Sequence, residues 1–79
     1  MEERTVEQVR QLATLKEELI RLYTEEITYA DRHYRMPPKS HEDKIHTITT
    51  QISDLVNARS LYRITHHCWY TAWRKFVQS

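Results

Sequence analysis

One short stretch, Met36-Pro37-Pro38-Lys39-Ser40, separates two long segments whose apolar residues recur with helical spacing. Two consecutive prolines remove two backbone donors and disfavour the helical conformation at the residue before each proline. We therefore expect one helix over about residues 6–35, a loop over 36–40 and a second helix over about 41–77. A connection of this length suits an antiparallel helical hairpin, so the predicted fold class is all-α.

Residues suited to helix capping stand at the N-terminal end of both expected helices. Thr5 is followed three positions later by Gln8, and Ser40 is followed three positions later by Asp43. This is the spacing of a capping box, in which two side chains bond the free backbone N–H groups of the first turn. We therefore expect Thr5 and Ser40 to be N-caps.

Apolar residues recur every seven positions in both segments, which predicts a coiled-coil-like seam between two helices packed nearly antiparallel. In the first helix this row is Val6, Ala13, Ile20, Ile27 and Tyr34. In the second helix the main row is Ile48, Leu55, Tyr62, Trp69 and Phe76, and a companion row contains Ile45, Ile52 and Trp73. On this pattern Tyr62, Trp69, Trp73 and Phe76 belong to the core. The alternative is a three-helix bundle with a break near Asn57–Ser60. Because no Pro or Gly forces that break, the continuous helix is preferred.

The composition limits the classes of protein to which the chain can belong. Its 79 residues suffice for a single helical domain over residues 1–79, and a net charge of +1 excludes binding to DNA or membranes by bulk charge alone. The sequence contains no glycine, which excludes a P-loop, a dinucleotide-binding fingerprint and a glycine-flanked nucleophile elbow. No apolar run is long enough to span a membrane. The lone Cys68 forms no internal disulfide, so we expect a cytoplasmic protein.

The two segments carry more apolar surface than one hairpin seam requires. Additional apolar positions would face outward from a two-helix hairpin, and such patches usually mark interfaces. We expect them to form a homodimer, in which two hairpins make a four-helix bundle. The predicted dimer interface contains Leu15, Leu22, Tyr29, Leu61 and Ile64. The alternative is that part of this surface binds a different protein.

The C-terminal third of the chain combines positive charge with aromatic rings. After Asp54 there is no acidic residue, whereas residues 55–79 hold four Lys or Arg side chains and five aromatic rings. Tyr, Trp and Arg dominate the residues that contribute most to protein interfaces. We expect the partner-binding residues to be Arg63, His67, Tyr70, Arg74 and Lys75, and the partner to present an acidic surface. The alternative is a nucleic-acid-binding module that uses the same basic, aromatic helix.

The sequence offers no convincing chemical site. His66, His67 and Cys68 are consecutive, so their side chains point about 100° apart on a helix and cannot close on one ion. For the same reason His67 does not face Cys68 as the base of a thiolate nucleophile would. We therefore expect no metal, no cofactor and no enzymatic activity. The predicted function is protein binding, as a small adaptor, regulator or inhibitor of a larger protein.

Overall fold

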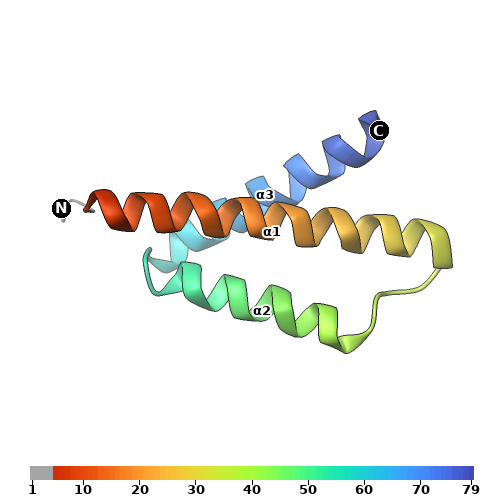
Figure 1. Ribbon diagram of the computed structural model, residues 1–79, viewed down its shortest axis with the longest axis horizontal. Helices are drawn as coiled ribbons and strands as arrows, with labels where there is room; N and C mark the ends of the chain where they lie inside the picture. The colour runs from red at the N-terminus through yellow and green to blue at the C-terminus, as the bar shows by residue number, and fades with distance from the viewer. Residues whose placement is uncertain (1–4) are drawn as a thin grey trace.

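The computed structural model describes residues 5–79, and within this range the chain forms three α-helices and no strand. They are α1 (Val6–His33), α2 (Lys39–Ser53) and α3 (Ala58–Gln78), shown in Figure 1. The all-α class is confirmed. The expected helix over 41–77 is wrong, because it is divided into α2 and α3, and with it the two-helix hairpin is lost. The expected domain begins at residue 1, and its first four residues lie outside the described range.

The break between α2 and α3 forms without proline or glycine. The backbone N–H of Leu55 donates to the carbonyl of Ile52 at 2.9 Å, a tight final turn that ends α2. Asn57 then takes an extended conformation, and its Oδ1 accepts a hydrogen bond from the backbone N–H of Ser60 at 2.8 Å. This bond makes Asn57 the N-cap of α3. The break therefore lies beside the position at which the three-helix alternative placed it.

The break changes which face of the C-terminal helix is buried. In α3 the residues turned toward the core are Leu61, Ile64, Cys68 and Ala72. The expected core residues Tyr62, Trp69 and Trp73 are 69%, 42% and 47% exposed, and Phe76 is half-buried. The buried row is displaced by one residue from the predicted heptad, which is a rotation of about 100°. The prediction that these rings form the core is wrong, because the break at 54–57 lets α3 turn its aliphatic and small side chains inward.

Of three helix ends predicted from the sequence, the structure confirms one and differs at two. At Thr5 the capping box is confirmed, since Gln8 N–H donates to Thr5 Oγ1 at 3.1 Å and Thr5 N–H donates to Gln8 Oε1 at 3.0 Å. Ser40 is not an N-cap, because α2 begins at Lys39, two residues before the predicted start, and Pro38, with its fixed φ, occupies the N-cap position. The first helix ends at His33, since Tyr34 adopts the left-handed conformation with φ of 54°.

All three helices meet at one fully buried contact. Leu19 of α1, Ile52 of α2 and Cys68 of α3 are each 0% exposed, and Leu15 completes the cluster. Of the seam residues, Ile27 and Ile52 are buried as predicted, while Ile20 and Leu55 are half-buried. Around this contact α1 packs against both other helices.

The helices diverge away from the core contact. The imidazole of His41, near the start of α2, lies 2.9 Å from the carbonyl of Leu22, so α2 runs back along α1. At the middle of α3 the Cys68 thiol lies 3.7 Å from the carbonyl of Lys16, and near its end Phe76 lines a cavity with Tyr34, so α3 runs in the direction of α1. Figure 1 shows α2 and α3 on different sides of α1, separating toward its C-terminal end. The C-terminal half of α1 is therefore left between two helices that do not close over it.

Replacing Asn57 tests whether its cap maintains the break. Asn57→Ala should lower the free energy of unfolding by about 0.5–2 kcal/mol, because the Ser60 N–H loses its acceptor. Asn57→Asp keeps an acceptor oxygen at the same place and should stay close to the native value. Urea unfolding followed by circular dichroism measures both. An alanine variant as stable as the native protein would show that the cap does not hold the break.

Candidate functional site

An apolar trough runs along the C-terminal half of α1, between the start of α2 and the end of α3. It consists of two adjoining cavities of about 440 Å³ and 360 Å³, which share Glu26 and Met36 in their lining. The larger cavity is lined by Glu26, Ile27, Ala30, Asp31, Tyr34, Met36, Trp69, Trp73 and Phe76. The smaller is lined by Tyr23, Glu26, Met36, Pro37, His41, Glu42 and Ile45. We call the two cavities together the trough.

Three rings of α3 form one side of the trough and are named here the aromatic wall: Trp69, Trp73 and Phe76. Their spacing of four and three residues places them on one side of the helix. The edge of Trp69 meets the ring of Tyr23 at a centroid distance of 5.3 Å and an interplanar angle of 83°, and Trp73 lies 5.8 Å from Phe76. Both indoles are held by neighbouring rings and are still nearly half exposed, as interface anchors are.

The connection between α1 and α2 closes the end of the trough. Tyr34 and Met36 both line the larger cavity and are both exposed. A left-handed residue other than glycine is uncommon, and here it turns the chain so that Met36 lies at the junction of the two cavities. Methionine has an unbranched, flexible side chain that adapts to different partners. This end of the trough can therefore adjust its shape.

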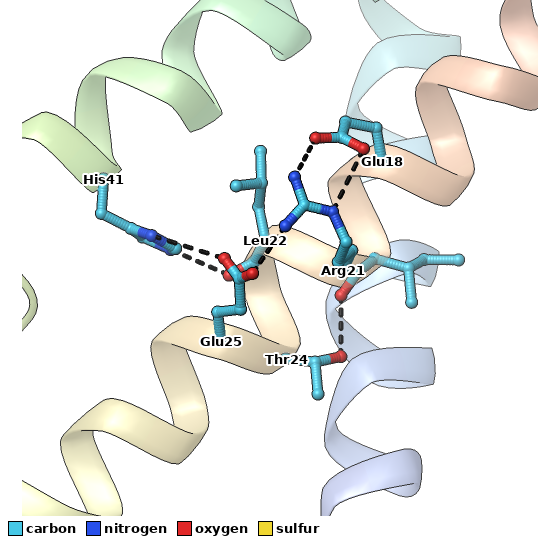
Figure 2. A network of polar contacts seen from close by, with 7 residues as sticks. Glu18, Arg21, Leu22, Thr24, Glu25 and His41 are labelled. Carbon is cyan, nitrogen blue, oxygen red and sulfur yellow. Dashed lines mark hydrogen bonds and ion pairs between the residues drawn. The ribbon is translucent and has the colours of Figure 1, made fainter.

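A polar network fixes the α2 side of the trough to α1 (Figure 2). The half-buried His41 ring places Nε2 2.9 Å from the carbonyl oxygen of Leu22 and Nδ1 3.9 Å from Glu25 Oε2. Arg21 donates to Glu25 Oε1 at 2.6 Å and also pairs with Glu18, and this contact lowers the pKa of the Glu18 carboxyl. The network sets the distance between α1 and the start of α2, and therefore the width of the smaller cavity.

The predicted partner-binding residues lie beside the aromatic wall. Arg63, His67, Tyr70 and Arg74 are all exposed, and at 100° per residue they fall with Arg59 within an arc of about 80°, which we call the basic stripe. The Arg74 guanidinium lies over the Tyr70 ring, 5.9 Å from its centroid. Lys75 is exposed but lies about 100° away from Arg74. None of the Lys or Arg side chains of α3 forms an ion pair with any residue in the range 5–79.

The residues predicted for a dimer interface lie mostly inside the chain. Leu15 and Leu22 are buried, and Leu61 and Ile64 pack against the core cluster. Tyr29 is half-buried and lies beside His33, at a centroid distance of 4.2 Å. The apolar surface that suggested self-association is therefore covered in large part by the packing of the three helices of the same chain. The structure does not bring these five residues together on one face.

No family model, curated protein or solved structure matches this chain.

Two further findings concern the chemistry of residues 5–79. No three His, Cys, Asp or Glu side chains in this part of the chain are placed to hold a metal ion, and none of its helices is long and apolar enough to cross a membrane. Cys68 is buried, its Sγ lies against the carbonyl of Lys16, and burial raises the pKa of its thiol. A buried thiol with a raised pKa is a poor nucleophile at neutral pH.

The sequence predicted four of the five exposed residues of the basic stripe, all except Arg59, and did not predict the trough. The stripe follows from composition, because it needs only an acid-free helix with Arg and Tyr on one side. The aromatic wall was assigned to the core, since the heptad pattern continues through the break. The signal that could have corrected this is the pairing of Asn57 with Ser60, a second capping site in the middle of the expected helix.

Glu26 is the carboxylate that both cavities share. Burial raises its pKa, the neighbouring His41 opposes this, and the nearby Glu42 adds to it. Folding therefore penalises the charged form of Glu26, and stability should increase as the pH falls through the raised pKa.

Neutralising Glu26 should show this penalty. At neutral pH Glu26→Gln should melt at the same temperature as the native protein or higher, because the amide removes the partly buried charge. Below the ordinary pKa of 4.5 the difference should vanish, since the side chain at position 26 is then neutral in both proteins. Melting curves across this pH range measure the effect. A variant that loses stability at neutral pH would show that the charge is stabilised in the trough.

Proposed function

We propose that this protein is a non-enzymatic, cytoplasmic protein-binding module, an adaptor, regulator or inhibitor of a larger protein, which acts through α3. One observation carries the proposal: the aromatic wall and the basic stripe lie side by side on one helix that has no acidic residue. Trp, Tyr and Arg are the residue types that contribute most to protein interfaces, and both indoles of this chain are nearly half exposed.

The charge of α3 favours a partner with an acidic surface. Its exposed Arg and Lys side chains have no carboxylate partner in the range 5–79, so they are free to pair with a bound molecule. Complementary charge speeds the encounter of two proteins and fixes their relative register. The rings of the aromatic wall would then supply most of the apolar area removed from water.

Nucleic acid is the second candidate, because an acid-free helix with Arg and aromatic rings also fits phosphates and stacked bases. The trough weakens this candidate, since Glu26, Asp31 and Glu42 would repel phosphate groups beside the aromatic wall. Titration of a mixed-sequence oligonucleotide at several salt concentrations separates the two. Tight binding that falls steeply with salt would favour nucleic acid over protein.

Fewer of the residues predicted for a homodimer interface remain accessible in this structure, so we propose a different protein as the main partner. Four of the five predicted interface residues contribute to the chain's own core. Light scattering at micromolar concentration should accordingly give a mass near 9.7 kDa. A mass of twice that value would restore the homodimer and make the aromatic wall its most suitable interface.

Charge reversal on the basic stripe tests the proposed function. The double variant Arg63→Glu with Arg74→Glu should weaken binding of a partner captured through a photoreactive group at position 70 by tenfold or more, about 1.4 kcal/mol. Folding should change little, because both side chains are exposed. The matched control is Arg10→Glu with Lys39→Glu, which reverses two exposed cations outside α3. Unchanged partner binding by the folded stripe variant would move the functional surface off α3.

A further inference from the structure

We infer that the trough binds a single amphipathic helix of the partner protein, about three turns long, with carboxylates along the edge that faces α3. This inference rests on the proposed function and specifies the partner element that the site takes. Its basis is the shape of the trough, the solvent exposure of the rings that line it and the distribution of charge around it.

The shape of the trough fits a helix. Its floor on α1 is the row Tyr23, Ile27 and Ala30, whose spacing of four and three residues follows one side of that helix, and Tyr34 lies just beyond the end of the helix. At 1.5 Å per residue α1 extends about 15 Å from Tyr23 to its end at His33, which is about three helical turns. Amphipathic helices bind apolar grooves through anchors spaced in this way.

The two sides of the trough give a bound helix contacts along its whole length. The aromatic wall stands on one side, and Met36, His41 and Ile45 stand on the other. Figure 1 shows that α2 and α3 separate at this end of α1, where the two cavities of the trough lie. The bound helix would cover the exposed faces of Trp69 and Trp73, which the chain itself leaves uncovered.

The charge around the trough selects the kind of helix. The basic stripe borders the aromatic wall, and its arginines have no ion-pair partner among the described residues. Carboxylates on the adjacent edge of a bound helix would pair with Arg74, the arginine of the stripe that lies level with the aromatic wall. The opposite edge would lie near Glu26, Asp31 and Glu42, so acidic residues are disfavoured there. A second copy of α3 fits less well, because its own basic stripe would approach this one with like charge.

The intrinsic fluorescence of the protein reports directly on the trough. The sequence contains two tryptophans, Trp69 and Trp73, and both belong to the aromatic wall. Removing their rings from water should shift the emission to shorter wavelength. The probes are three synthetic peptides of about 11 residues, or three helical turns, without aromatic side chains. One has an apolar face with Glu along one edge, the second replaces each Glu by Lys, and the third has the residues of the first in scrambled order.

The acid-edged peptide should produce a saturable blue shift. The base-edged peptide should bind at least tenfold more weakly, and the scrambled peptide should cause no shift. Equal binding of the acid-edged and base-edged peptides would contradict the inferred carboxylates on the bound helix. The absence of an emission shift with all three peptides would contradict the inference that the trough binds a helix. If a captured partner nevertheless depends on Arg63 and Arg74, the proposed function stands and this inference alone fails.

Blocking the floor of the trough gives a matched pair of variants. Ala30→Arg places a long side chain on the floor and should abolish the shift caused by the acid-edged peptide. Ala13→Arg puts the same side chain at an exposed position of the same helix outside the trough, and binding should be unchanged. Circular dichroism establishes that both variants fold. Retained binding by a folded Ala30→Arg protein would show that the peptide binds elsewhere, and would overturn the inference.

Discussion

Leu19, Ile52 and Cys68 form the contact on which the arrangement of this molecule depends. Each belongs to a different helix, and each is fully removed from water. The contact lies near the C-terminal end of α2 and at the middle of α3, and beyond it α2 and α3 diverge along the C-terminal half of α1. A chain this short has enough apolar residues for one such contact and too few to fill the space that opens beyond it. The trough follows from that imbalance.

The small side chains of α3 make the contact possible. Cys68 and Ala72 are both fully buried, and their size lets the backbone of α3 approach α1 closely enough for the thiol to reach the carbonyl of Lys16. Larger rings at these positions would hold the two helices apart. The indoles are therefore placed on the neighbouring side of α3, where they are supported by Tyr23 and Phe76 and remain accessible.

Much of the local structure could be predicted from the sequence. The first helix, its capping box and the interruption at the two prolines follow from rules that involve residues a few positions apart. The division of the second segment could not be predicted by periodicity, because the heptad continues from Ile48 to Phe76 and no proline or glycine interrupts it. Only the capping hydrogen bond of Asn57 and the packing of Leu55 and Val56 against the core decide it.

The candidate site also has one part that depends on a single helix and one part that depends on contacts between residues far apart in the sequence. The basic stripe is a property of one helix and was found from composition. The trough is built from residues more than forty positions apart, such as Ala30 and Trp73, and its existence depends on the rotation of α3 about its axis. A displacement of one residue in the buried row decides whether two tryptophans lie in the core or at a surface. No pattern within a single helix carries that information.

Because Cys68 is buried, the reactivity of its thiol reports local unfolding of the protein. Cys68 is the single cysteine of the chain. It is buried where α3 packs against α1, with its thiol against the carbonyl of Lys16. An alkylating reagent reaches this sulfur only when α3 lifts from α1, so the rate of modification reports the free energy of that local unfolding. A ligand that bridges α1 and α3 must slow the same reaction in proportion to its occupancy. Thiol protection thus links the anchored middle of α3 to binding at the neighbouring aromatic wall, which begins at Trp69.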